Sequence, residues 1–303
     1  MSEAMKEAIP FNLPNLEIQR RLGKGGMASV WLARQISLDR PVAVKILSSE
    51  FSADESDICQ FRREAELAAQ LRHPGIVEVY DANFSNGNYY FVMEFVDGYT
   101  MGELLRRKKA LDLDDVLIIA ESVAVAMDYA WSQFRMVHCD IKPDNIMVDA
   151  DGTLKVTDLG LCRTLTLKES QTERTESDEI FGTPAYMSPE QIYGEEELDA
   201  RSDIYALGAT MYHLITGRML FNDRSDDQVI HCHIGKDQAP DPRFFRPSMP
   251  QPFVLLLEKM LAKNREQRPR DWRALLEDLT NVRHGYPPQA VLIGPGESSL
   301  KLK

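Results

Sequence analysis

The hydrophobic pattern of the chain changes its period at a turn, Asp97-Gly98. Before the turn, short runs of apolar and β-branched residues predict strands, for example at 42–47, 76–80 and 89–96. After it, apolar residues recur at helical spacing at 113–134, 204–216, 253–262 and 272–282. Because each half must bury its own apolar faces, the pattern predicts an α+β protein with a strand-rich part at 16–96 and a helical part at 97–285.

One helix and two irregular ends complete this outline. Apolar residues from Ile58 to Leu71 predict a helix within the strand-rich part, which Asp54 or Ser56 could cap and which ends at 73–75. Turn-forming residues mark 1–15 as a flexible lead-in. Prolines and glycines mark 286–303 as a flexible tail.

Composition narrows the range of partners and compartments. The net charge of −12 over 303 residues disfavours nucleic acid and anionic lipid surfaces. Four cysteines form neither a disulfide framework nor a Cys-x-x-Cys zinc motif, which is typical of a reducing compartment. The first residues lack the apolar run of a signal peptide, and no apolar stretch is long enough to span a membrane. We therefore expect a cytoplasmic protein with no nucleic-acid partner and no membrane insertion.

A glycine-rich stretch follows the first predicted strand. Glycines in Gly23-Lys24-Gly25-Gly26-Met27-Ala28-Ser29-Val30 would let backbone N–H groups approach phosphate oxygens closely. A simple hairpin turn explains this stretch equally well. Lys45 then stands alone as a charge in an apolar strand, and Glu64 on the following helix could pair with it. A lysine in a strand is usually just solvated, so this pair alone decides nothing.

Chemically distinctive groups gather at 138–145 and 158–160. His138-Cys139-Asp140-Ile141-Lys142-Pro143-Asp144-Asn145 is followed by Asp158-Leu159-Gly160, and the acids and the amide supply hard oxygen ligands suited to Mg²⁺. A polar hairpin loop would account for the composition. It would not account for the order in which these groups follow the glycine-rich stretch and Lys45.

In this order, the motifs resemble those of the eukaryotic-type serine/threonine protein kinases, and most closely their bacterial branch. The resemblance covers about 16–283 and includes the segment 182–190, the segment 202–208 and Arg268-Pro269. It implies the bilobed protein kinase fold, with a small β-rich N-lobe that carries one helix and a larger helical C-lobe. It also implies ATP-dependent phosphorylation of Ser and Thr hydroxyls on protein substrates, with autophosphorylation in the activation loop.

The resemblance implies a role for each motif residue. Lys45 would hold the α- and β-phosphates and be fixed by Glu64, Asp140 would orient the substrate hydroxyl and accept its proton, and Lys142 would steady the γ-phosphate. Asn145 and Asp158 would bind Mg²⁺, with Mn²⁺ as an alternative. The ATP-binding residues would be Leu22, Gly23, Lys24, Gly25, Gly26, Met27, Ala28 and Val30 around the glycine loop, then Ala43, Met93, Glu94, Val96, Thr100 and Met147.

Within this set, the adenine would lie between Leu22, Val30, Ala43 and Met147. Its edge would meet the backbone of Glu94 and Val96, with Met93 as the gatekeeper and Thr100 near the ribose. Outside the set, Glu190 and Arg268 would form a structural ion pair, and Asp203 would hold the backbone of the catalytic loop.

Three positions depart from the family pattern. Ala28 replaces the third glycine, Leu159 replaces a phenylalanine, and Cys139 replaces the arginine that commonly precedes the catalytic aspartate. That arginine receives a phosphorylated activation-loop residue where it is present. The activation loop at 161–180 offers several hydroxyls, of which Thr175 and Ser177 best resemble the family's phosphorylation sites. The sequence therefore leaves open whether activity depends on loop phosphorylation.

The sequence is also compatible with other functions and partners. A pseudokinase scaffold would tolerate Ala28 and Cys139, and a small-molecule kinase would not need the peptide-docking segment at 182–190. The basic run 106–109 and the motif His231-Cys232-His233 are best read as a solvated helix face and as a packing or surface role, with an acidic partner and a metal site as the alternatives. A homodimer could form during autophosphorylation. Because the chain stops after the kinase region, we expect a sensor to be absent or to lie on another protein.

Overall fold

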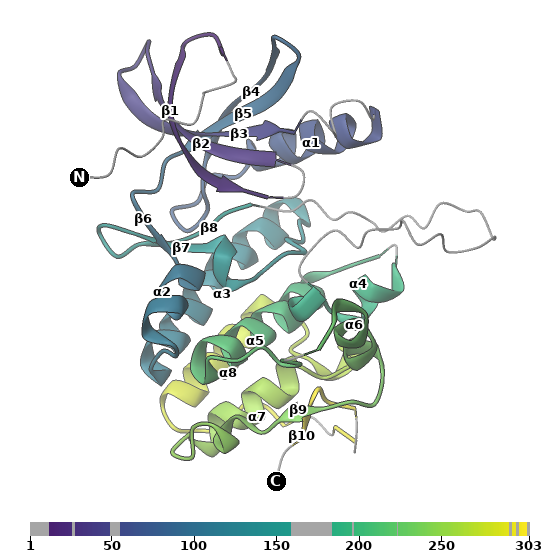
Figure 1. The fold of residues 1–303 in the computed structure, drawn as a ribbon. Helices are drawn as coiled ribbons and strands as arrows, with labels where there is room; N and C mark the ends of the chain where they lie inside the picture. The colour runs from purple at the N-terminus through teal and green to yellow at the C-terminus, as the bar shows by residue number, and fades with distance from the viewer. Residues whose placement is uncertain are drawn as a thin grey trace, which may run out of the picture. The chain divides into compact units, whose positions relative to one another are not determined.

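The computed structural model describes residues 12–25, 28–48, 55–158, 184–195, 197–222, 224–290, 293–294 and 297–301, without the side chains of 55–57, 60, 63 and 64. These residues form two compact units. The first lies within Met1–Arg72 and Val77–Asp97, and the second within His73–Ile76 and Gly98–Lys303. Figure 1 colours the first unit purple to blue and continues the second through teal and green to yellow.

The first unit is a five-stranded antiparallel sheet with one helix. The strand order is β1-β2-β3-β5-β4, and α1 connects β3 to β4 (Figure 1). The elements are β1 (Leu16–Lys24), β2 (Ala28–Gln35), β3 (Arg40–Leu47), α1 (Glu55–Ala68), β4 (Val79–Ser85) and β5 (Asn88–Glu94).

The two faces of this sheet differ in what they bury. One face carries an apolar cluster that includes Trp31, Val44 and Ile46, none of them more than 5% exposed. Since side chains alternate along a strand, the residues between the cluster members lie on the opposite face. There α1 packs Phe61 against Phe91 of β5, with ring centroids 5.0 Å apart. The alternation therefore leaves β3 with one face that is apolar beyond Arg40 and one face that carries Lys45.

The second unit is mainly helical. It contains α2 (Met101–Lys108), α3 (Leu113–Phe134), α4 (Pro189–Tyr193), α5 (Ala200–Thr216), α6 (Asp226–Ile234), α7 (Gln251–Met260) and α8 (Trp272–Arg283). Two small sheets join them, one of β6 (Gly98–Thr100), β7 (Ile146–Asp149) and β8 (Leu154–Val156), the other of β9 (Ala239–Pro240) and β10 (Leu300–Lys301). Helix α5 is buried nearly all round and contacts α3, α7 and α8, so it forms the centre of this unit.

The structure confirms the α+β class and most of the predicted elements. Helix α3 has the predicted bounds, because its apolar stripe is continuous from end to end. Helix α7 begins at Gln251, two residues earlier than predicted, because Pro252 is well placed in a first helical turn. Ser56 lies inside α1 and is not its N-cap.

Three parts differ from the prediction. The strand expected at 76–80 instead begins at Val79, while Ile76 forms an isolated bridge with Val156 in the second unit. Of helix α2, the sequence predicted only a helix face at 106–109, and its start at Met101 was missed although Thr100 and Glu103 form a capping box there. The flexible tail expected at 286–303 contains a short strand, β10, and buried residues at 298–300, because backbone hydrogen bonds can hold a segment that has no apolar pattern. Among the described residues, no helix is long and apolar enough to cross a membrane.

Candidate active site

The first unit positions Lys45 by strand pairing. On the face opposite the apolar cluster, Lys45 is paired with Val30 of β2 and with Phe91 of β5, and Ala43 is paired with Met93. The Lys45 Nζ lies 5.4 Å from the centroid of the Phe91 ring, within the range of a cation–π interaction. The structure thus brings together the lysine and three of the residues predicted to surround adenine. The side chain of Glu64 lies outside the described residues.

The glycine loop is the β1–β2 hairpin. Gly23 pairs with Val30, and the N–H of Gly25 donates to the carbonyl of Ala28 at 2.9 Å. A Cβ on Gly23 would meet nothing within 4 Å, and one on Gly25 would lie 3.4 Å from the Ala28 oxygen. Packing among the described residues therefore does not require glycine at either position. Gly26 and Met27 lie outside the described residues, and Leu22 and Lys24 are exposed beside them.

The residues predicted for the adenine edge and the ribose are divided between the units. In the first unit, the N–H of Glu94 donates to the carbonyl of Glu78 at 2.8 Å, and Val96 is buried. In the second, Thr100 of β6 pairs with Met147 of β7. The Thr100 hydroxyl accepts the N–H of Glu103 at 3.0 Å and so caps α2. A ribose contact would have to share this hydroxyl.

The second unit assembles the catalytic loop around Asp140. The Lys142 Nζ donates to both carboxylate oxygens of Asp140, at 3.0 and 2.7 Å. The Asn145 Nδ2 donates to one of these oxygens and to the Asp140 carbonyl, both at 2.8 Å. Because a short 3₁₀ turn, Pro143–Asn145, folds the chain back, three residues predicted to be functional meet within one loop.

Helix α5 fixes the backbone of this loop. Asp203 accepts the N–H groups of His138 at 2.6 Å and of Cys139 at 2.8 Å, as the family resemblance predicted. Cys139 has a φ of 66°, a left-handed conformation that costs energy for a side chain with a Cβ. Gln191 holds it in place by donating to its carbonyl at 2.8 Å, and Thr210 donates to the Ile141 carbonyl at 3.3 Å. Sequence reasoning missed Gln191 and Thr210, for which the local sequence carries no signal.

His138 connects the catalytic loop to Asp158. The ring is fully buried; Nδ1 accepts the Asp140 N–H at 3.2 Å, and Nε2 lies 3.1 Å from the Thr157 carbonyl. Burial lowers the pKa of His138, so the ring is neutral and Nε2 is the donor. The N–H of Thr157 donates in turn to the Asn145 carbonyl at 3.0 Å. These bonds tie the residue before Asp158 to Asn145, a role for His138 that the sequence did not indicate.

The two predicted metal ligands fit a divalent cation that also binds a nucleotide. Asn145 uses its Nδ2 as the donor toward Asp140, so a cation would meet its side-chain oxygen. Among the described residues, no group of three or more His, Cys, Asp or Glu could hold a metal. Mg²⁺ usually takes one or two carboxylates and completes its shell with water and phosphate oxygens. The protein thus supplies a partial set of hard oxygen ligands of the kind that such a cation requires.

A buried ion pair supports the segment expected to dock peptides. Arg268 donates to Glu190 at 2.6 and 2.9 Å, and the two side chains are 0% and 3% exposed. Burial opposes the charge of Glu190, but the hydrogen bonds and charge of Arg268 prevail and lower its pKa. The Ser202 hydroxyl also donates to Glu190, at 2.7 Å. Gly182, Thr183, Leu159 and the activation loop lie outside the described residues.

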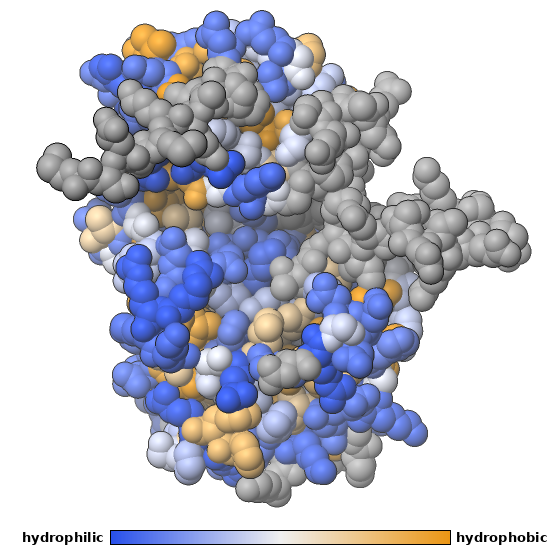
Figure 2. Space-filling view, viewed as in Figure 1, coloured by the Kyte–Doolittle hydropathy of each residue, from blue (hydrophilic) through white to orange (hydrophobic). Residues whose placement is uncertain are grey.

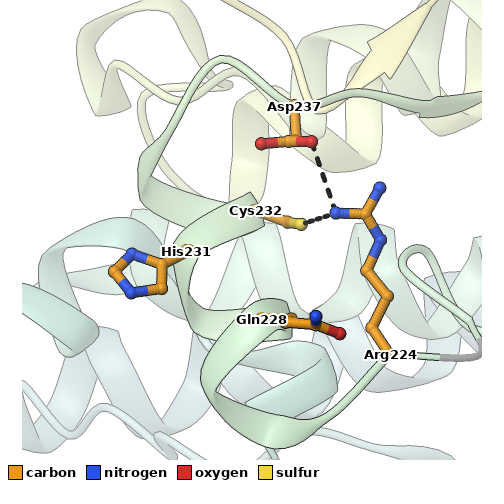
Figure 3. A pocket seen from close by; sticks show the side chains of 5 residues that line it. All are labelled: Arg224, Gln228, His231, Cys232 and Asp237. Atoms are coloured by element: carbon orange, nitrogen blue, oxygen red, sulfur yellow. Dashed lines mark hydrogen bonds and ion pairs between the residues drawn. The ribbon is translucent and has the colours of Figure 1, made fainter.

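The remaining sequence motifs lie elsewhere in the second unit. A pocket beside α6 is lined by Arg224, Gln228, His231, Cys232 and Asp237 (Figure 3). In it, Arg224 contacts the Cys232 thiol and the Asp237 carboxylate, and His231 points away from both (Figure 3). His233 is buried. The His-Cys-His motif therefore does not converge on one point.

The basic run lies at the end of α2, where hydrophilic side chains gather (Figure 2). Arg106 pairs with Asp144 of the catalytic loop at 3.3 Å, with both side chains more than half exposed.

Comparison with known proteins agrees with this geometry. Residues 16–279 match the protein kinase domain family. The chain is 40% identical to the serine/threonine-protein kinase PrkC of Bacillus subtilis over 82% of its own length, and 36% identical to PknB of Mycobacterium tuberculosis over 90%. It spans 37% and 44% of these two relatives. It also superimposes on the crystal structure of the Mycobacterium tuberculosis PknI kinase domain with a TM-score of 0.71, at 26% identity and covering 89% of this chain and 97% of that one.

The matched region contains both units, from the start of β1 almost to the end of α8. It includes the glycine loop, Lys45, the catalytic loop around Asp140 and the Glu190–Arg268 pair. The protein kinase fold predicted from the motifs is thereby confirmed, and the chain belongs to the protein kinase family, in its bacterial serine/threonine branch of eukaryotic type.

Proposed function

We propose that the chain transfers the γ-phosphoryl group of ATP to Ser and Thr hydroxyls of protein substrates and phosphorylates its own activation loop. The observation that carries this proposal is the catalytic loop. Asp140 is held by Lys142 and Asn145 on a backbone that Asp203 fixes. Phosphoryl transfer depends on positioning and on neutralising charge more than on covalent chemistry, and this loop is built for both.

Each residue has a defined part in the transfer. The Asp140 carboxylate orients the acceptor hydroxyl and takes its proton. The Lys142 ammonium, which already lies against Asp140, neutralises charge on the transferred group. Lys45 binds the α- and β-phosphates from the first unit, with Glu64 as its expected partner. Asn145 and Asp158 would hold Mg²⁺, or Mn²⁺ in its place, and the cation would neutralise charge on the phosphate oxygens.

The proposal extends to the substrate class and the setting. Lys142 and the segment at 182–190 resemble serine/threonine kinases, and the curated relatives carry that name. We place the protein in the cytoplasm, with protein substrates and no nucleic acid as partners, and with a homodimer during autophosphorylation. A scaffold without catalysis finds no support in the site, because every group that the reaction needs stands at its expected position in the sequence.

The test is transfer of labelled phosphate from ATP to a generic basic protein. We expect the purified chain to label Ser and Thr in the presence of Mg²⁺. Removing the general base by Asp140→Asn should lower the rate by about 10²–10⁴, and Asp158→Ala should abolish metal-dependent transfer. Asp151→Ala, at an exposed carboxylate in the turn between β7 and β8, is the matched control and should leave the rate unchanged. Equal rates for Asp158→Ala and the wild type would contradict the assignment of that residue.

A further inference from the structure

The segment 297–301 lies beyond the family match, which ends at 279, yet it is built into the second unit. Ser298, Ser299 and Leu300 are at most 1% exposed. Strand β10 pairs in parallel with β9, the Ala239 N–H donates to the Ser299 carbonyl at 2.7 Å, and the Ser299 N–H donates to the Leu261 carbonyl at 3.0 Å. We call residues 297–301 the strap.

Side chains also hold the strap. The Gln238 Nε2 donates to the carbonyls of Ser298 at 3.0 Å and Leu300 at 2.8 Å. The Ser298 hydroxyl donates to the Glu258 carbonyl at 3.3 Å and accepts the Leu300 N–H at 3.1 Å. Buried polar groups that are all satisfied in this way define one position for the segment.

Ser299 has a different connection from its neighbour Ser298. Its hydroxyl lies 2.7 Å from the hydroxyl of Tyr205 on α5, and the Tyr205 hydroxyl lies 2.7 Å from Nδ1 of His233 on α6. All three side chains are 0% exposed. The Tyr205 ring also lies beneath the guanidinium of Arg268, 4.8 Å from its centroid, and Arg268 binds Glu190.

His233 carries this chain of contacts to the docking segment, whose described part is 184–190. Helix α6 contacts the 3₁₀ turn Pro184–Tyr186, and the carbonyls of Pro184 and Ala185 are the backbone groups that bear on the His233 ring. If the Tyr205 hydroxyl donates to Nδ1, the neutral ring must carry its proton on Nε2, and those carbonyls favour a proton on the ring. Among the described residues, Nε2 has no hydrogen bond of standard geometry, so the orientation of the ring depends on Tyr205.

We infer that Ser299 is a positioning residue: through Tyr205 and His233 it sets the docking segment in place, and so the strap tunes the binding of protein substrates. The inference rests on the proposed function, because it assigns the docking segment to the substrate. It predicts an effect on the KM for protein but not on the KM for ATP or on kcat, since Asp203 of α5 holds the backbone of the catalytic loop from outside the docking segment.

The experiment compares Ser299→Ala with Ser298→Ala, a matched control of the same residue type and burial that does not touch Tyr205. Ser299→Ala should raise the KM for a protein substrate about fivefold, the change expected for one lost hydrogen bond. Its kcat and its KM for ATP should stay within about twofold of wild type. Ser298→Ala should loosen the strap and leave all three constants near wild type.

A second measurement does not depend on activity. Amide hydrogen exchange at 185–194 should rise in Ser299→Ala and in Tyr205→Phe, and to no greater extent in the double variant, because both remove the same link. Exchange in Ser298→Ala should rise only at the strap and β9.

Three results would show whether the inference about Ser299 or the proposed function is wrong. Identical exchange and kinetics for Ser298→Ala and Ser299→Ala would overturn the inference, as would additive effects in the double variant. A wild-type chain that transfers no phosphate would instead contradict the proposed function, while the exchange measurement would still decide whether Ser299 controls the docking segment.

Discussion

The two units hold their predicted functional residues by different physical means. In the first, strand pairing positions Lys45, and the other face of the same strand is sealed by apolar side chains such as Val44 and Ile46. In the second, buried polar contacts position Asp140, above all those of Asp203. A sheet-built site responds to packing changes, whereas a site built on buried polar groups responds to charge and pH. All six histidines of the chain also belong to the second unit.

The largest effect should come from breaking the buried ion pair of the second unit. Arg268→Met leaves the Glu190 carboxylate buried without its partner, which costs about 3–5 kcal/mol in the free energy of unfolding. Arg106→Met removes one partner of the exposed pair with Asp144 and should cost less than about 1 kcal/mol. Urea unfolding followed by circular dichroism measures both. Equal losses would show that burial does not distinguish the two pairs.

Neighbouring residues on β3 test the first unit. Lys45→Ala removes a positive charge facing the phosphates and should lower the transfer rate by about 10²–10³. Ile46→Val alters only the apolar face and should cost about 0.5–1.5 kcal/mol of stability without changing the rate. If Ile46→Val slows transfer as much as Lys45→Ala does, the two faces of β3 do not have separate roles. Initial rates and thermal melting of each variant provide the two readouts.

Acid should destabilise the second unit. Burial lowers the pKa of His138, of His213 to about 4 and of His233 to about 3, and raises the pKa of Asp203 to about 7. Between pH 6 and 5, unfolding lets His213 and His233 take up about two protons while Asp203 releases about one, a net uptake of about one, and His138 acts in the same direction. Stability rises with pH wherever the unfolded state binds more protons, so it should fall by about 1–2 kcal/mol from pH 6 to pH 5.

A series of urea titrations from pH 7 to pH 5 checks this slope. His213→Gln removes one of the imidazoles that take up a proton on unfolding and should reduce the slope by about 1 kcal/mol per pH unit. A flat profile in the wild type would mean that these histidines are protonated in the folded protein, contrary to their burial.

The smallest effect concerns phosphates on the activation loop. Cys139 offers no cation to a phosphate on Thr175 or Ser177, and its backbone is already held by Asp203 and Gln191. We therefore expect Thr175→Ala/Ser177→Ala to lose at most a few-fold in rate toward an exogenous protein, as should phosphatase-treated wild type. A loss of two orders of magnitude in both would show that another cation, such as Arg163, receives the phosphate.

Local patterns predicted the elements, and long-range contacts account for most of what they missed. The apolar stripe of α3 and the alternation of β3 lie within one element and can be read directly. The contacts of Gln191 and Thr210 with the catalytic loop join residues 52 and 69 positions apart, which no local pattern records. The strap was taken for a flexible tail because its stability comes from backbone partners on other elements. The capping box at Thr100 was a local signal that could have revealed α2.

The residues that hold the catalytic loop and the docking segment lie far along the sequence from their partners, so these contacts form late in the synthesis of the chain. During synthesis, Asp203 is added 65 residues after His138, and Ser299 is added 94 residues after Tyr205. At a synthesis rate of about 5–20 residues per second, the second interval alone lasts about 5–19 s. Before Asp203 is made, the catalytic loop lacks the side chain that holds its backbone. Before Ser299 is made, Tyr205 and His233 lack the hydroxyl that completes their hydrogen-bonded chain. The two sets of contacts therefore form in sequence, the catalytic loop first and the strap last.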